Sequence, residues 1–160
     1  VPDFNWGLNV QLGYKNFDLS MFFQGVCGVD VYNNQKFQTD FWSLTDAGSN
    51  KGNRMLGAWT EDNTSSKIPA LTTNNTGDEG RASTYFVEHG NWMKLRTLQL
   101  GYNFSDSLLK KLHMTSARVY VSGQNLFTWK SSSFTISDPE NPNWAYPHSS
   151  SVSFGLQLSF

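Results

Sequence analysis

The side chains that could carry out catalysis are scattered along this chain of 160 residues. Its three histidines, His89, His113 and His148, lack the spacing of metal ligands. A Ser-x-x-Lys pair, Ser107 and Lys110, has no companion motif and falls in a short connector between predicted strands. We therefore expect no enzymatic activity, no metal site and no cofactor.

The polar loops hold better candidates for recognition. Asp138, Glu140 and Asn141 could offer oxygen atoms to calcium, but the Asp-Pro sequence is more typical of a plain turn. Large aromatic rings with a polar edge suit the faces of sugars, and several lie in these loops. The candidate contact residues are Trp42, Trp59, Trp144 and Tyr146.

The composition excludes some partners and favours one fold class. The net charge is −1 and only 16% of residues are charged, so no basic surface is expected for nucleic acid. Aromatic residues make up 15% of a chain whose mean hydropathy is −0.46. No run of about 18 apolar residues predicts a spanning helix. Short strands separated by polar loops fit these values, and the single Cys27 cannot form an internal disulfide.

The last ten residues alternate strictly between apolar and small or polar side chains. Because side chains on a strand point to opposite faces in turn, this segment has one apolar face and one polar face. Such an ending is typical of an outer-membrane barrel, whose last strand faces lipid on one side and water on the other. The apolar positions are Val152, Phe154, Leu156, Leu158 and Phe160.

Four earlier segments, within residues 4–15, 17–24, 85–104 and 116–129, are also predicted strands. In the first, rings flank aliphatic residues, as expected when aromatic side chains lie at two membrane interfaces. In the third, Trp92, Lys94 and Arg96 would share the apolar face. Since two cations in lipid are costly, this part either rises above the membrane or contains a bulge that changes its register.

The connections alternate in length, which predicts an all-β transmembrane barrel segment. Residues 15–16 and 105–114 are short connectors, the second with a helical turn capped by Ser105 or Ser107. Residues 28–84 and 130–150 are long and polar, with short ordered pieces expected at 30–37 or 59–71. Five strands cannot close a barrel whose smallest form has about eight, so we expect part of a larger barrel. The alternative is a soluble, carbohydrate-binding β-sandwich.

Several blocks, in the same order, resemble the C-terminal part of SusC/RagA-type TonB-dependent outer-membrane transporters. The two longest are residues 85–102 and 118–128, and the first departs from the common pattern at His89 and Trp92. Shorter similar blocks are residues 2–4, 14–19, 138–140, 146–147 and 154–156.

The resemblance implies that residues 1–160 are the C-terminal strands of a 22-stranded barrel in the outer membrane of a Gram-negative bacterium, of the Bacteroidetes type. Short turns would face the periplasm and long loops the outside. It further implies a plug and a TonB contact elsewhere in the protein, a SusD-like lipoprotein as a lid, and import of oligosaccharides or peptides.

The same resemblance gives roles to the candidate residues. The four loop aromatics would contact substrate or the lid, and Phe160 would be read by the assembly machinery. The alternative within the same class is a TonB-dependent receptor for siderophores or cobalamin.

Overall fold

The computed structural model describes residues 1–41, 50–71, 80–111, 113–141 and 146–160. The chain divides into two compact units. The sheet unit comprises residues 1–30, 89–134 and 146–160, and the loop unit comprises residues 31–88 and 135–145. Within the described residues, no helix has the length and apolar character needed to cross a membrane.

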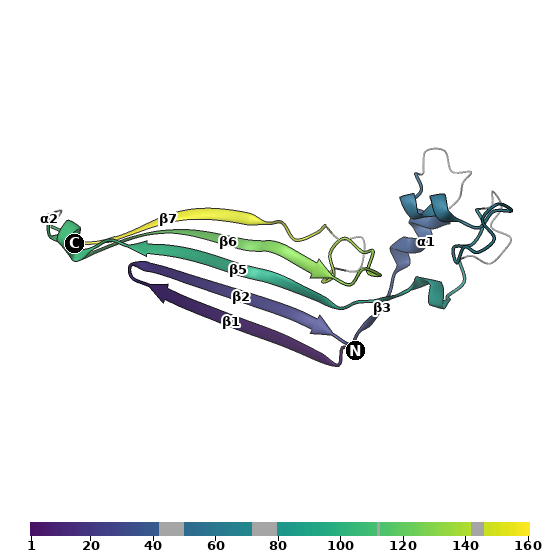
Figure 1. Cartoon of the computed structure of the whole chain (residues 1–160), viewed down its shortest axis with the longest axis horizontal. Coiled ribbons are helices and arrows are strands. Elements are labelled where there is room, and N and C mark those ends of the chain that lie inside the picture. Colours follow the sequence, from purple (N-terminus) through teal and green to yellow (C-terminus); the bar gives the residue numbers. More distant parts are fainter. Residues whose placement is uncertain (42–49, 72–79, 112, 142–145) are drawn as a thin grey trace. The chain divides into compact units, whose positions relative to one another are not determined.

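The sheet unit is one antiparallel sheet of five strands in the order β1-β2-β5-β6-β7 (Figure 1). The strands are β1 (Phe4–Tyr14), β2 (Phe17–Cys27), β5 (Trp92–Asn103), β6 (Ser116–Lys130) and β7 (Ser151–Ser159). The β1–β2 turn uses Lys15 at a φ of 53°, and the helix α2 (Asp106–Lys111) links β5 to β6. Both short connections therefore lie at one end of the sheet, and the predicted strands are confirmed.

The strand registers turn the sequence alternation into two continuous faces. Residues that pair across the ladder share a face, and two adjacent rows near the short-turn end are each uniform in character. One apolar row runs through Leu12, Leu19, Leu100, Val121 and Phe154. The adjacent row is polar and runs through Gln11, Ser20, Gln99, Ser122 and Ser153.

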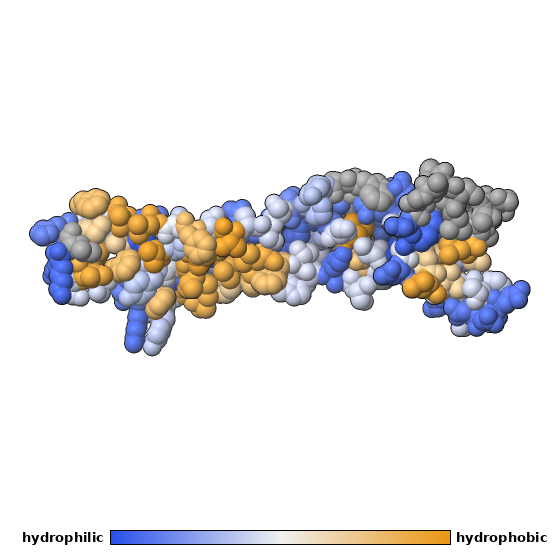
Figure 2. Space-filling model, turned by 90° about the horizontal axis from the view of Figure 1, so that it is seen from above, coloured by the Kyte–Doolittle hydropathy of each residue, from blue (hydrophilic) through white to orange (hydrophobic). Residues whose placement is uncertain are grey.

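The apolar face of the sheet is exposed rather than packed against a second layer. Leu8, Leu100 and Leu156 are 51%, 41% and 59% exposed. Figure 2 shows hydrophobic side chains gathered over the strands. A β-sandwich requires these leucines to be buried between two sheets. The β-sandwich alternative is therefore wrong for the described part of the chain.

A bulge at Arg96 resolves the position of the cations in β5. The register shifts between Phe22 and Phe23 on β2, and again between Leu95 and Thr97 on β5. Leu95 then pairs with Phe23 on the apolar face, while Lys94 pairs with Gln24 on the polar face. The predicted bulge is confirmed, and it removes the lysine from the apolar side.

The loop unit is more ordered than the sequence predicts. It contains α1 (Asn34–Asp40) and the 3₁₀ helices η1 (Asn53–Gly57) and η2 (Thr84–Phe86). The chain enters and leaves it through the short strands β3 (Asp30–Tyr32) and β4 (Val87–His89), which pair with each other. The unit has a core of its own, formed by Phe41, Met55, Ala58 and Phe86.

One sequence expectation for this region needs correction. Where the structure describes residues 28–84, they do not form a largely structureless loop, because aromatic residues distant in sequence meet in one core. The strand predicted within residues 85–104 is β5, which begins at Trp92, while Tyr85 lies in η2.

The predicted helical turn after Ser105 is confirmed as α2. The backbone carbonyl of Ser105 accepts hydrogen bonds from the amides of Leu108 and Leu109. The hydroxyls of Ser105 and Ser107 lie 3.1 Å apart. Because Ser107 lies within the helix, Ser105 is the serine that precedes its start.

Candidate functional site

The polar face carries an ion pair near its short-turn end. The guanidinium of Arg118 on β6 donates to both carboxylate oxygens of Asp18 on β2, with Nε 3.2 Å from Oδ2 and Nη2 2.5 Å from Oδ1. Asn103 on β5 donates to the same carboxylate at 3.2 Å. This arrangement ties three strands together through a bidentate, charge-assisted contact.

Glycines let the large side chains of this face lie flat. The guanidinium of Arg118 and the carboxylate of Asp18 cover Gly101, where a Cβ atom would lie 2.5 Å from both Nη2 and Oδ2. In the same row, the Tyr120 ring covers Gly155 at a similarly short distance. The polar face is therefore smooth at this end, with its bulky groups held against the sheet.

Replacing Gly101 by alanine is expected to break the Asp18–Arg118 pair. The new methyl group would occupy the space of the guanidinium, so the full-length protein should lose about 1–3 kcal/mol of stability. Thermal unfolding in detergent measures this loss. Gly13→Ala is the matched control, because Gly13 also pairs with Asp18 but a methyl group added there would meet nothing within 4 Å. Equal unfolding temperatures for the two variants would contradict the prediction.

A second polar cluster surrounds the bulge at the other end of the face. Arg96 donates from Nε to Gln24 Oε1 at 2.9 Å and from Nη1 to Asn125 Oδ1 at 3.2 Å. Asn125 has a φ of 51°, which an asparagine tolerates better than most residues. Lys94 is only 2% exposed and its Nζ lies 5.7 Å from the centre of the Trp92 ring. Charged groups thus populate both ends of the polar face.

A buried charge network organises the loop unit. Asp40, at the end of α1, is fully buried. Its carboxylate accepts hydrogen bonds from Arg54 Nε at 2.7 Å and from the Tyr85 hydroxyl at 2.8 Å. Arg54 also donates from Nη2 to the hydroxyl of Thr39 at 3.0 Å. Asp40 therefore joins α1, η1 and η2.

Glu88 forms the other half of this network. It is 4% exposed and accepts hydrogen bonds from the backbone amide and the hydroxyl of Thr135, both at 2.8 Å. Asn33 donates to the same carboxylate at 3.2 Å, and Lys36 Nζ lies 3.7 Å away. Glu88 thus joins the two chain segments of the loop unit, since Thr135 lies 47 residues further on.

Burial shifts the pKa of two groups in this network. Burial raises the pKa of the Tyr85 phenol above its ordinary value of 10.0, and the hydrogen bond to Asp40 raises it further. Burial also lowers the pKa of the Lys36 ammonium from 10.5, while Glu88 opposes that shift. Tyr85 therefore remains a hydrogen-bond donor to Asp40 at neutral pH. The network pairs two cations with two anions, which suits a structural role.

The structure describes two of the four loop aromatics that the sequence predicts as contacts, and it also describes Phe160. Trp59 is 42% exposed in the loop unit, and Tyr146 is 95% exposed in the sheet unit. Trp42 and Trp144 lie outside the described residues. Phe160, which follows β7, is 86% exposed.

The segment that carries Trp59 is held by its own hydrogen bonds. The backbone amide of Trp59 donates to the carbonyl of Ile68 at 2.9 Å. The side chains of Ser66 and Asn63 donate to the carbonyl of Gly57 at 2.6 and 3.2 Å. The indole is therefore presented from a closed, hydrogen-bonded loop.

The remaining chemistry-bearing residues have structural partners. The Asp138 side chain accepts a hydrogen bond from the backbone amide of Glu140 at 3.1 Å, which confirms the predicted turn. His89 Nδ1 lies 2.8 Å from Asp30 Oδ1, and these residues end β4 and begin β3. Ser107 lies on α2 and contacts Ser105. Ser107 and His89 are thus placed in separate surroundings.

Comparison with known proteins decides the family. No family model matches the chain. It is 32% identical over its whole length to TonB-dependent receptor P3 of Formosa agariphila, and 30% identical over 96% of its length to TonB-dependent receptor SusC of Bacteroides thetaiotaomicron. The chain is homologous over its full length to a segment of SusC/RagA-type TonB-dependent receptors. It spans only 15–16% of the length of these two curated relatives.

The solved structures agree with this assignment to the SusC/RagA type. The RagAB peptide importer in its "open-open" state matches all of the chain with a TM-score of 0.79 and 28% identity. The "closed-closed" state matches with a TM-score of 0.80. In both, the matched segment is 17% of the solved chain. TonB-dependent receptors are outer-membrane transport proteins of Gram-negative bacteria, and the SusC/RagA-type segment belongs to that setting.

Proposed function

We propose that the chain is the C-terminal wall segment of a 22-stranded outer-membrane barrel. The observation that carries this proposal is the exposed apolar face, on which Leu8, Leu100 and Leu156 are each more than 40% exposed. In a barrel of this kind, that face contacts lipid and the opposite, polar face borders the lumen. The short connections would then lie in the periplasm and the long ones outside.

The distribution of rings on the apolar face supports this orientation in a membrane. Aromatic residues gather near both ends of the strands, and the residues between them are mostly aliphatic, with Phe154 as an exception. Strands of about ten residues, at ~3.3 Å per residue and a tilt near 45°, cover roughly 25 Å, which is the height of a lipid-facing band. At the short-turn end the rings include Tyr14, Phe17 and Tyr102, and at the other end Phe4, Trp6, Phe127 and Trp129.

The outer strands β1 and β7 support the proposal that further strands complete the barrel. Each is hydrogen-bonded to a neighbour on one side only within the described sheet. Unpaired backbone groups are costly in hydrocarbon, so both edges need a strand partner. The chain spans only 15–16% of the two curated relatives, so the rest of such a protein is long enough to supply the partner strands.

As part of the whole protein, the segment would serve an importer of peptides or oligosaccharides that works with a SusD-like lipoprotein. The peptide importer RagAB supports the first substrate class, and the relative SusC supports the family. The segment supplies wall, lumen surface and outer loops, while TonB would act through a plug elsewhere in the protein. Trp59 and Tyr146, together with Trp42 and Trp144, are the proposed contacts for substrate or lid, and Phe160 is the proposed assembly signal.

Uptake measurements test this function. Deleting the gene for the full-length protein should abolish uptake of one class of labelled peptide or oligosaccharide, and disrupting TonB should have the same effect. Uptake of ferric siderophores and cobalamin should not change, which serves as the control. Loss of siderophore or cobalamin uptake alone would favour the other kind of TonB-dependent receptor.

A further inference from the structure

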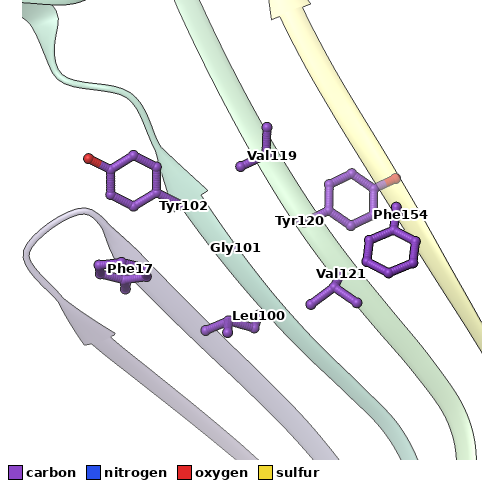
Figure 3. A pocket seen from close by; sticks show the side chains of 8 residues that line it. All are labelled: Phe17, Leu100, Gly101, Tyr102, Val119, Tyr120, Val121 and Phe154. Carbon is purple, nitrogen blue, oxygen red and sulfur yellow. The ribbon is translucent and has the colours of Figure 1, made fainter.

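A hollow of about 260 Å³ lies on the apolar face near the short-turn end of the sheet (Figure 3). It crosses β2, β5, β6 and β7, all within the sheet unit. The side chains of Phe17, Leu100, Tyr102, Val119, Val121 and Phe154 line it, with Gly101 and Tyr120.

Rings form the borders and short aliphatic side chains form the floor. On one side Phe17 and Tyr102 are paired across β2 and β5, with ring centres 4.8 Å apart. On the other side Phe154 of β7 is 85% exposed. Between them lie Val119 and Val121 of β6. Strand spacing places β5 and β7 about 10 Å apart, which leaves room for one extended hydrocarbon chain.

Basic residues lie at the same end of the sheet. The β1–β2 turn contains Lys15, and α2, which joins β5 to β6, ends in Lys110 and Lys111. The one acidic residue of these two connectors is Asp106, in the first turn of α2. All four residues are exposed. The described connectors at this end of the sheet therefore carry a net positive charge.

We propose that the hollow binds an acyl chain of an anionic phospholipid whose phosphate is held by Lys110 and Lys111. This inference rests on the proposed function, since it requires the apolar face to lie in a bilayer. Charge complementarity selects the occupant, because clustered lysines beside a membrane-embedded surface attract anionic headgroups. The ring of Tyr102 lies at the same end, where aromatic side chains commonly reach the headgroup level.

Native mass spectrometry of the full-length protein tests the proposal. The protein is exchanged into detergent, incubated with either phosphatidylglycerol or phosphatidylcholine, and the retained lipids are counted. Wild type should retain phosphatidylglycerol in preference. Replacing Lys110 and Lys111 together by glutamate should lower that retention about tenfold.

A second variant probes the hollow itself. Val121→Phe fills the floor without adding charge, and it should reduce retention of both lipids. Lys67→Glu, at an exposed lysine of the loop unit, and Val10→Phe, on the apolar side of β1, are the matched controls and should retain lipid as wild type does.

Retention that is equal for both lipids, or unchanged in the lysine and valine variants, would overturn the inference. These results would leave the proposed function intact, provided that the variants still assemble in the outer membrane. A full-length protein that never enters the outer membrane would instead contradict the proposed function.

Discussion

Leu100→Arg is expected to prevent the full-length protein from accumulating in the outer membrane. Leu100 lies on the exposed apolar face, between the two groups of aromatic residues. An arginine costs about 2–4 kcal/mol at the middle of a lipid-facing band and about 0–1 kcal/mol at its edges. Leu100 lies one row inside the Phe17 and Tyr102 rings, so we expect a cost between these limits, about 1–3 kcal/mol. Fractionation of the outer membrane, followed by heat-modified migration on gels, measures the folded protein.

The neighbouring residue supplies the control for this experiment. Gln99 lies in the adjacent row on the polar face, one position along the same strand. Gln99→Arg places the same charge in the proposed aqueous lumen, so assembly should remain close to wild type. If Gln99→Arg were the more damaging of the two changes, the assignment of the faces would be reversed.

Asp40→Ala is expected to disorder the loop unit while leaving the sheet intact. The substitution removes the carboxylate that accepts from Arg54 and Tyr85, and it leaves a partly buried guanidinium without that partner. Breaking such a pair from one side costs about 3 kcal/mol or more. Hydrogen exchange of the full-length protein should therefore show faster exchange in α1 and η1 and unchanged exchange in β5.

Two further variants, Asp40→Asn and Asp62→Ala, separate the loss of this charge from general damage to the loop unit. Asp40→Asn keeps an acceptor for the Tyr85 hydroxyl but loses the charge, so its exchange should be intermediate. Asp62, an exposed acid of the same unit, should tolerate alanine without effect. Unchanged protection of α1 in Asp40→Ala would show that the network does not hold the unit together.

The sheet could be predicted from the sequence because its signal is local. A period of two assigns each residue to a face, and strand neighbours in sequence are also neighbours in space for β1–β2, β5–β6 and β6–β7. The cost of placing Lys94 and Arg96 in lipid predicts either a segment above the membrane or a bulge, and the structure shows a bulge at Arg96.

The loop unit could not be predicted in the same way, because its contacts are distant in sequence. Phe41 and Phe86 meet in one core, and Glu88 contacts Thr135 across 47 residues. Some local signal was present, since Phe37 and Phe41 are four positions apart, as on one side of a helix. The partners of Asp40 gave no such signal, because Arg54 and Tyr85 lie outside its helix.

The sequence also does not predict which candidate contact residues lie close together in space. Trp59 and Tyr146 are exposed, as expected of recognition residues, but they belong to different units. Which of the proposed aromatic contacts meet the same ligand depends on the rest of the protein, which the sequence of this segment does not specify.

The most direct test of the two-faced wall is an accessibility scan across two adjacent rows. Single cysteines are placed at Leu100 and Val121 on the apolar row and at Gln99 and Ser122 on the polar row, in a Cys27→Ser background of the full-length protein. Each is spin-labelled in lipid bilayers, and its collision rates with oxygen and with a water-soluble nickel chelate are measured. We predict that oxygen, which concentrates in lipid, dominates at the apolar row, and that the chelate dominates at the polar row. Labels on the apolar row that are shielded from both reagents, as in a dry protein interior, would contradict the proposal.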